Sequence, residues 1–388
     1  MKALVVRAEW APKEDYVLNE TEKRRKLAYN SNMVWKNPTF GVENDYPDPT
    51  CGAKDVVLKV AACGVCGSDV HMLMKRPDNY IFYAGEAGFP VVIGHEFAGE
   101  VVEVGKDVKT VAVGDYVTAE EVQWCGECIA CRYGLFNQCS NLDQLGFDHP
   151  NDGAMAEYIR VEEKFVYKLN DLRRLYPDKQ SIMEAGSMVE PTCVAYEGMF
   201  SVAKGFQVGS HVAVYGTGPI GLAAIQLAKC AGAANIIAFE VNDNRRALAL
   251  KMGADFVYNP KDVDPVAAVM EHTNGFGVGM AVEAAGAYSA TMASMEKILS
   301  IAGKIILVGM GEDYPEIHPM LHHRLGSGIY ATLGHSGRGV FASVINLMAS
   351  GRIQVTPAIT ARYSLDDSVQ GIQSLMKSVD EAKVLITP

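Results

Sequence analysis

The sequence predicts a two-part α/β fold, an antiparallel barrel-like half followed by a parallel, doubly wound sheet. The first observation is a set of alternating strand patterns separated by turns in the N-terminal part, such as Val91–Gly105. The second is a change near Ser210, after which short apolar strands alternate with helical segments. The third is the length of 388 residues, which is typical of two or more domains.

The predicted strands of the first part are short. They are Ala3–Arg7, Val56–Ala61, Val91–Gly105, Val111–Val117 with a Gly-Asp turn inside it, and Asp152–Ile159. The charged, aromatic segment Trp10–Pro49 lies between the first two strands, and its composition favours a solvated loop or a short helix. A flap over a pocket or a contact between subunits is the alternative interpretation of this segment.

The second part repeats a strand-then-helix pattern, beginning with the helix Leu222–Gly232 after the first strand. Its strand patterns are His211–Tyr215, Ile236–Glu240, Phe256–Tyr258, Met280–Glu283 and Lys304–Gly309. They predict a parallel sheet of about six strands. From about Arg338 the chain carries a helix, Phe341–Met348, and a closing strand, Lys383–Thr387.

Composition excludes several classes of function. The chain is 49% hydrophobic and 21% charged with a net charge of −11, so the basic footprint of a nucleic-acid-binding protein is absent. No apolar run reaches the roughly 18 residues of a membrane helix, and Met1–Arg7 lacks the features of a signal peptide. The 9 cysteines are clustered, which favours free thiols and metal sites in a reducing compartment. We therefore expect a cytoplasmic protein without nucleic-acid or membrane partners.

The segment from Cys63 to Glu96 concentrates metal-ligating side chains. Cys66 and His95 are preferred ligands of zinc, and Glu96 beside His95 offers an oxygen ligand. A catalytic zinc keeps one coordination position open, so three protein ligands are enough. The alternative for each motif taken singly is a buried cysteine or an ordinary turn.

Three further polar residues of this segment have predicted supporting roles. Asp69 can accept the second N–H of a metal-bound histidine. Ser68 and His71 can pass a proton from the substrate oxygen at the metal to solvent.

A second cysteine cluster predicts a structural metal site. Cys125, Cys128, Cys131 and Cys139 follow the spacing C-x2-C-x2-C-x7-C. Four thiolates so close together are typical of a closed, tetrahedral zinc site. An iron–sulfur cluster is the alternative, but the run lacks the Cys-Pro ending of bacterial ferredoxins, so zinc is favoured.

The turn Gly216-Thr217-Gly218-Pro219-Ile220-Gly221 predicts a dinucleotide site. It has the pattern G-x-G-x-x-G between a strand and a helix. Gly216 makes the tight turn, Gly218 lets the backbone approach the pyrophosphate, and Gly221 allows close helix packing. The phosphates would lie at the N-terminus of the helix that starts near Pro219 and Ile220.

Glu240, at the end of the next predicted strand, decides the cofactor. A carboxylate there can accept from the ribose hydroxyls and would repel a 2′-phosphate, which favours NAD. Arg245 and Arg246 leave NADP open, because a nearby arginine can accommodate the extra phosphate.

Glu190 precedes Pro191, which suits the first turn of a helix. Glu190 would then sit just before that helix, where its side chain could point into a cleft. An acid favoured by the helix macrodipole is the alternative.

Taken together, these motifs resemble the zinc-dependent medium-chain alcohol and polyol dehydrogenases over nearly the whole chain. The resemblance rests on Cys-Gly-Val-Cys-Gly-Ser-Asp-Val-His, Gly-His-Glu, the four-cysteine run, Glu-Pro and the glycine fingerprint. It implies a GroES-like β-barrel catalytic domain at 1–191 and 338–388, and a Rossmann NAD-binding domain at 192–337. It also implies two zinc ions per chain, bound to catalytic and structural ligands respectively.

The resemblance assigns the site residues as follows. Cys66 and His95 are implied as ligands of the catalytic zinc, with the third protein ligand open between Glu96 and Glu190. Ser68 and His71 are implied as the proton relay that passes through the nicotinamide ribose. Lys383 resembles a basic residue that contacts the cofactor pyrophosphate, and Arg245 is a candidate cofactor-binding residue from the fingerprint itself.

Glu190-Pro191 places the chain beside sorbitol, threonine and butanediol dehydrogenases. The N-terminal insertion, the acids Glu120-Glu121 and the run Gly334-His335-Ser336-Gly337 look most like cyclitol enzymes that act on inosose-type ketones or aminocyclitols. Glu121 and His335 are therefore candidate substrate contacts. An open-chain polyol or L-threonine is the alternative substrate, and a non-catalytic relative is a more remote one.

The resemblance also implies assembly. The branch is usually dimeric or tetrameric through pairing of the cofactor-domain sheets, so we expect a homo-oligomer, with a tetramer favoured over a dimer. The apolar run Ile301–Val308 suits either a sheet that continues across an interface or a buried parallel strand.

Overall fold

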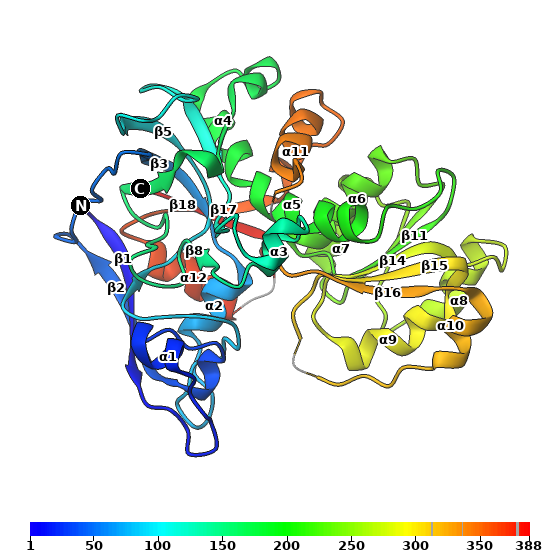
Figure 1. The fold of residues 1–388 in the computed structure, drawn as a ribbon. Helices are drawn as coiled ribbons and strands as arrows, with labels where there is room; N and C mark the ends of the chain where they lie inside the picture. The colour runs from blue at the N-terminus through cyan, green and yellow to red at the C-terminus, as the bar shows by residue number, and fades with distance from the viewer. Residues whose placement is uncertain (312, 336, 378–379) are drawn as a thin grey trace. The chain divides into compact units, whose positions relative to one another are not determined.

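The computed structural model describes residues 1–311, 313–335, 337–377 and 380–388 (Figure 1). Ser336, which belongs to the cyclitol-like run, lies outside the described residues. Packing divides the chain into two units. The first is Met1–Glu190, Ala361–Ser378 and Lys383–Pro388, and the second is Pro191–Thr360 and Val379–Ala382.

The first unit is built around a 7-stranded antiparallel sheet, with the order β10-β6-β5-β3-β18-β17 and β9 on β3. Its strands are β3 (Asp55–Gly64), β5 (Glu96–Val104), β6 (Tyr116–Ala119), β9 (Tyr158–Glu162), β10 (Val166–Lys168), β17 (Ile359–Ser364) and β18 (Lys383–Thr387). The long strand β3 pairs antiparallel with β5, β9 and β18. This confirms the antiparallel first half.

A 3-stranded sheet covers part of this unit, with the order β2-β1-β4. Its strands are β1 (Ala3–Trp10), β2 (Trp35–Glu43) and β4 (Val91–Val92). The prediction of a solvated loop or short helix between Trp10 and Pro49 is wrong for β2, which pairs along β1. Pro38 and Gly41 weaken the strand pattern, but Trp35 is 2% exposed and packs edge-on against Trp10 at 4.9 Å. Burial of this indole stabilises the strand.

The insertion also holds the short helix α1 (Glu20–Arg25) and the 3-10 turn η1 (Ser31–Met33). Asn19 caps α1, since its side chain accepts from the backbone N–H groups of Thr21 and Glu22. The short helix predicted as one possibility for the segment Trp10–Pro49 is therefore present.

Other boundaries differ from the sequence predictions. The predicted strand at Val91–Gly105 is broken into β4 and β5 by Gly94, whose φ is 97°. The strand predicted at Val111–Val117 begins only at Tyr116. The remaining short elements are α2 (Gly67–Leu73), β7 (Val122–Gln123), α3 (Ile129–Arg132), η2 (Phe136–Gln138), β8 (Asp143–Gln144), η3 (Glu163–Phe165), η4 (Asn170–Arg174), α4 (Lys179–Ser187) and α12 (Ser368–Lys377).

The second unit is a 6-stranded parallel sheet with the order β13-β12-β11-β14-β15-β16. Its strands are β11 (Val212–Tyr215), β12 (Ile236–Phe239), β13 (Phe256–Tyr258), β14 (Val278–Glu283), β15 (Leu299–Leu307) and β16 (Gly328–Ala331). Its helices are α5 (Val189–Tyr196), continued by the π-helix η5 (Glu197–Val202), α6 (Pro219–Cys230), α7 (Asp243–Lys251), α8 (Pro265–His272), α9 (Tyr288–Lys297), α10 (Pro319–Leu325) and α11 (Val340–Ala349), with the 3-10 turn η6 (Thr356–Ala358). The reversal of strand order at β11 and β14 is that of a dinucleotide-binding sheet. The doubly wound prediction is confirmed.

The boundary after this sheet differs from the expected one. We placed 338–388 with the catalytic domain, but residues 338–360 pack with the second unit. The backbone N–H of Gln354 donates to the side chain of Gln226 on α6 at 3.0 Å, which ties the segment to this sheet. Among the described residues, no helix is both long and apolar enough to cross a bilayer.

Candidate active site and metal centres

Cys66 is held at the start of α2 by Asp69. The strand β3 ends at Gly64, and Cys66 is the residue just before the first helical turn. Asp69 Oδ2 accepts the backbone N–H of Cys66 at 2.8 Å, and Asp69 Oδ1 accepts the backbone N–H of Gly94 at 3.2 Å. The buried carboxylate of Asp69 therefore joins the two segments that carry the predicted ligands.

His95 and Glu96 come from the start of β5. Ligand atoms of Cys66, His95 and Glu96 all lie within 4.8 Å of one another. Nδ1 of His95 lies 3.7 Å from Asp69 Oδ1, on the side where a metal-bound histidine meets its supporting carboxylate. A Cβ at Gly64 would overlap the Glu96 carboxylate, so glycine is needed at that end of β3.

The charges around His95 favour a cation. Burial lowers the pKa of His95, but Asp69 and Cys66 outweigh it and raise that pKa well above its usual range. The same excess of negative groups would stabilise a divalent ion. One thiol, one imidazole and one carboxylate are a donor set that fits a catalytic zinc.

Lys383 lies against Glu96 in the interior of the first unit. Its side chain is 1% exposed, and Nζ donates to Glu96 Oε2 at 2.5 Å and to the carbonyl of Val65 at 3.0 Å. Burial lowers the pKa of Lys383, but Glu96 and Cys66 raise it overall, so the ammonium stays charged. Lys383 thus contacts the predicted ligand Glu96, and its predicted contact with the cofactor pyrophosphate stays a prediction.

Glu190 lies inside the helix rather than before it. The helix α5 begins at Val189, which places Glu190 in the first turn, where the macrodipole favours an acid. Glu190 is 4% exposed, and its charge raises the pKa values of His95 and Lys383. Glu96, and not Glu190, is the acid whose ligand atom lies within 4.8 Å of those of Cys66 and His95.

Ser68 and His71 lie one turn apart on α2. Ser68 Oγ is buried and has no hydrogen-bond partner in the part of the chain that the structure describes. The His71 ring packs against Phe82 with centroids 5.1 Å apart. The spacing of three residues puts both side chains on one helix face, as a relay requires. Their catalytic role stays a prediction, as do the substrate contacts of Glu121 and His335, which are both buried.

Two aromatic residues beside the ligands were missed by sequence reasoning. The Phe147 ring lies 4.9 Å from the His95 ring and 5.7 Å from the Tyr83 ring, measured between centroids. Tyr83 and Phe147 are both buried. The signal in the sequence for Tyr83 was the aromatic run Tyr80–Tyr83. This run lies in the segment that connects the motif at Cys66 to the motif at His95.

The four-cysteine run closes on itself as predicted. All four sulfur atoms lie within 4.8 Å of one another. Sγ of Cys139 lies 3.5 Å from that of Cys125 and 3.8 Å from that of Cys128. Sulfurs around a single tetrahedral zinc, with bonds of about 2.3 Å, are about 3.8 Å apart. The spacing therefore fits one ion better than a cluster whose irons bind the thiolates separately.

Backbone N–H groups stabilise the thiolate forms of Cys125 and Cys128, which are the forms that bind metal. N–H groups of Glu127 and Cys128 point at Cys125 Sγ, both at 3.4 Å. Backbone N–H groups of Cys131 and Ser140 lower the pKa of Cys128 to about 5, which favours the thiolate. All 9 cysteines of the chain are free of disulfides.

The glycine turn of the second unit has the geometry of a phosphate cradle. Gly216 has a φ of 84°, and Gly218 is the residue just before α6, which starts at Pro219. A Cβ at Gly221 would overlap the Gly216 carbonyl, so the helix can approach the strand only with glycine there. The N-terminus of α6 is thus open to a pyrophosphate.

Glu240 lies at the end of β12 beside this turn. Its Oε2 accepts the Thr217 N–H at 2.9 Å and its Oε1 accepts the Asn242 N–H at 3.0 Å. Nη2 of Arg245 donates to the Glu381 carbonyl at 2.6 Å, and Nη1 of Arg246 to the Glu240 carbonyl at 2.9 Å. Both guanidinium groups are thus engaged by main-chain carbonyls of the same unit.

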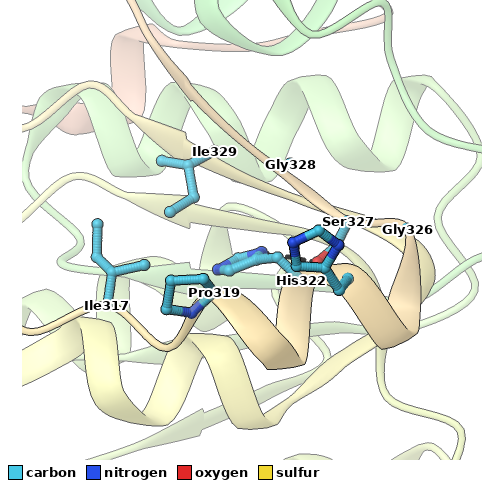
Figure 2. A pocket seen from close by; sticks show the side chains of 8 residues that line it. Ile317, Pro319, His322, Gly326, Ser327, Gly328 and Ile329 are labelled. Carbon is cyan, nitrogen blue, oxygen red and sulfur yellow. Dashed lines mark hydrogen bonds between the residues drawn. The ribbon is translucent and has the colours of Figure 1, made fainter.

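A separate hollow of about 610 Å³ lies between α10 and β16 (Figure 2). Ile317, Pro319 and Ile329 give it apolar walls. His322 bridges Ser327 Oγ at 2.7 Å and the buried Glu296 carboxylate at 3.0 Å. This hollow contains none of the predicted site residues.

Two family descriptions match the chain. Residues 52–171 match the alcohol dehydrogenase GroES-like domain, and residues 219–350 match the zinc-binding dehydrogenase family. The chain is 36% identical to scyllo-inosose 3-dehydrogenase of Thermotoga maritima, with 99% of each chain covered. It is 34% identical to L-threonine 3-dehydrogenase of Pyrococcus abyssi, covering 90% of this chain and 95% of that protein.

Solved structures agree with these matches. A protein from Thermotoga maritima described as an alcohol dehydrogenase superposes with a TM-score of 0.95, at 36% identity and with 100% of both chains covered. A protein from Sinorhizobium meliloti 1021 described as a zinc-binding dehydrogenase bound to NADP gives a TM-score of 0.78, at 30% identity, covering 90% of this chain and 96% of that one.

Proposed function

Because the chain belongs to the zinc-dependent medium-chain alcohol and polyol dehydrogenase family, we propose that it oxidises a ring hydroxyl of a cyclitol or aminocyclitol to a ketone with NAD. The observation that carries the chemistry is the convergence of Cys66, His95 and Glu96 on one point. The substrate class is supported by the near-complete match to a relative named scyllo-inosose 3-dehydrogenase.

The protein's part in the reaction is to hold the substrate oxygen and move its proton. A zinc ion held by Cys66, His95 and Glu96 would polarise that oxygen and lower the pKa of the alcohol. Asp69 Oδ1 lies 3.7 Å from Nδ1 of His95, and with zinc bound it would orient the imidazole. Ser68 Oγ, buried without a protein partner among the described residues, is the group that accepts the proton, and His71 on the same helix face passes it on.

The second unit would bind the nicotinamide cofactor, which would supply the acceptor for the hydride of the substrate carbon. The cradle at Gly216 and Gly221, which a Cβ would fill, fits a dinucleotide pyrophosphate. We propose NAD rather than NADP because Glu240 would repel a 2′-phosphate and both nearby arginines are bonded to carbonyls. NADP is the alternative cofactor, because one relative of known structure is bound to NADP.

The names of other relatives support a second class of substrate. Several relatives are named L-threonine 3-dehydrogenase, so an open-chain polyol or a 3-hydroxy amino acid is the alternative to a cyclitol. A non-catalytic role is disfavoured by the complete set of predicted ligands and by the relay serine.

We also propose that the protein is a cytoplasmic homo-oligomer, and we favour a tetramer over a dimer. The free thiols suit a reducing compartment. The sheet order ends at β16, whose outer edge offers backbone groups to another strand. Ile301 is 83% exposed and Met320 is 63% exposed, and Ile317 lines the hollow beside this edge. Apolar surface of this kind is typical of an interface.

Light scattering tests the assembly. The mass should be a multiple of the 42.0 kDa chain, and Ile317→Asp should lower it. Val208→Asp, at a site that is 76% exposed elsewhere in the second unit, is the control that should leave the mass unchanged. A wild-type monomer would contradict the proposal.

A substrate panel tests the function. The purified zinc-loaded enzyme is assayed for NAD reduction with inositols, aminocyclitols, sorbitol, L-threonine, cyclohexanol and ethanol. A site that bonds several hydroxyls rejects analogues lacking them by factors up to about 10⁴. We expect cyclitols to exceed cyclohexanol and ethanol widely in kcat/KM. Preference for sorbitol or threonine would select the alternative, and equal rates on ethanol would overturn the polyol assignment.

A further inference from the structure

Tyr83 lies beside the catalytic ligands. Its backbone N–H donates to the carbonyl of His71 at 3.1 Å, so the loop that carries it is fixed to the end of α2. Its ring packs on Phe147, which in turn packs on His95, with centroids 5.7 Å and 4.9 Å apart. This chain of aromatic contacts places the tyrosine in the wall of the zinc site.

The Tyr83 hydroxyl can still donate and accept a hydrogen bond. Tyr83 is 8% exposed, and within the described part of the chain its oxygen bonds no protein group and is not fully enclosed. The phenol oxygen can therefore be reached from outside the protein, and it is a polar group at the end of an apolar ring. A substrate oxygen would be its hydrogen-bond partner.

Charged groups of the predicted ligand set lie near the Tyr83 side chain. Burial comes first in raising the pKa of Tyr83, and the groups that raise it further are Cys66, Glu86, Asp69 and Glu121, in that order. Cys66 is a zinc ligand and Asp69 supports another. The phenol therefore stays protonated at neutral pH and can only be a donor or a neutral acceptor beside the ligand set.

We propose that Tyr83 is a substrate-contacting residue that sets specificity, donating a hydrogen bond to a hydroxyl oxygen next to the reacting carbon. Phe147 would cover the apolar C–H face of the same substrate. This inference rests on the proposed polyol dehydrogenase function and names the group that distinguishes a polyol from a simple alcohol. A substrate with one hydroxyl gains nothing from Tyr83, because its only oxygen is the reacting one.

Gly85 provides the room for this arrangement. A Cβ at Gly85 would overlap the hydroxyl end of the Tyr83 ring, with Cζ only 2.5 Å away. Gly85→Ala should therefore push the phenol away from its position without removing its chemistry. It is a second variant that perturbs the same contact by a different route.

The experiment compares Tyr83→Phe with the wild type on a cyclitol and on cyclohexanol. We expect kcat/KM for the cyclitol to fall about 10- to 100-fold, through KM and kcat together, and kcat/KM for cyclohexanol to stay within about twofold. Calorimetric binding of the cyclitol to the NADH-bound enzyme should weaken in parallel. Zinc content should stay at the wild-type value, and Gly85→Ala should show the same selective loss. Tyr314→Phe, at a tyrosine that is 95% exposed, is the matched control and should change nothing.

The outcomes separate the inference from the function on which it rests. If the wild type oxidises cyclitols but Tyr83→Phe loses nothing, or loses both substrates equally, the specificity role is wrong and the dehydrogenase assignment stands. If the wild type oxidises no cyclitol, both proposals are overturned. If Tyr83→Phe loses zinc, its role is structural and the inference fails.

Discussion

Lys383 Nζ lies 2.5 Å from Oε2 of Glu96, although 287 positions of sequence separate the two residues. Their side chains are 1% and 2% exposed. A buried ion pair costs about as much in desolvation as it gains in attraction, but removing one partner leaves a charge without compensation. Lys383 therefore holds the Glu96 carboxylate in place and compensates its charge.

Lys383→Met should lower the free energy of unfolding of the metal-free protein by about 3–5 kcal/mol. The loss should be smaller with zinc bound, because the metal then compensates Glu96. Denaturant unfolding with and without chelator measures both. Lys2→Met is the control, since its pair with Asp366 is 30% and 67% exposed and should contribute at most about 1 kcal/mol. Equal losses in the two variants would contradict this account.

Two kinds of zinc site should respond differently to mutation. Cys66→Ser should remove one zinc and the activity while the fold survives. Cys128→Ser should remove the other zinc and lower the melting temperature, because a structural zinc contributes folding free energy. Elemental analysis, melting and activity are measured together, with Cys230→Ser as the control outside both sites. Retention of full metal in both variants would refute the ligand assignment.

Glu86 should make stability depend on pH. Burial and the nearby Asp148 raise the pKa of Glu86 to about 7, against 4.5 in an unfolded chain. The folded state therefore favours the protonated acid, and this stabilisation is lost as pH rises from about 4.5 to about 7.

Glu86→Gln should thus raise the melting temperature at pH 8 and have little effect near pH 4.5. Since Glu86 is only partly buried, we expect a gain of about 1–2 kcal/mol, well below the full value of its shift. Glu14→Gln, at an exposed acid, is the control that should leave the pH series unchanged. A destabilised variant at pH 8 would show that the charged form is the stabilising one.

Cofactor choice should depend on Glu240. Glu240→Ala removes the acceptor for ribose hydroxyls and the repulsion of a 2′-phosphate, so the NAD-to-NADP ratio of kcat/KM should fall at least tenfold, or about 1.4 kcal/mol. Glu271→Ala, at an exposed acid of the same unit, should leave the ratio alone. A wild type that prefers NADP would count directly against the proposal.

The elements that could be predicted are those with a local signature. The turn at Gly216 combines a buried strand, three glycines and a helix, and each requirement is visible within a few residues. The four cysteines are likewise close in sequence, so their convergence needed no knowledge of the fold. Cys66 and His95 were identified by residue type, and their meeting depended on strand pairing.

The elements that were missed depend on distant packing. The strand β2 was hidden by Pro38 and Gly41, and it forms because Trp35 is buried against Trp10. The contact of Lys383 with Glu96 was missed because nothing near Lys383 in the sequence indicates Glu96. Pairing between β18 and β3 creates that contact, and such long-range register is not encoded in any local pattern.

The pairing of β18 with β3 also sets an order of events during synthesis. The ribosome must release almost the entire chain before the strand that lies beside β3 exists, whereas Cys66, His95 and Glu96 emerge early. Chains fold from the N-terminus as they are made. A nascent chain therefore presents the three metal ligands before Lys383 arrives to pair with Glu96, and metal capture at that stage would precede completion of the sheet.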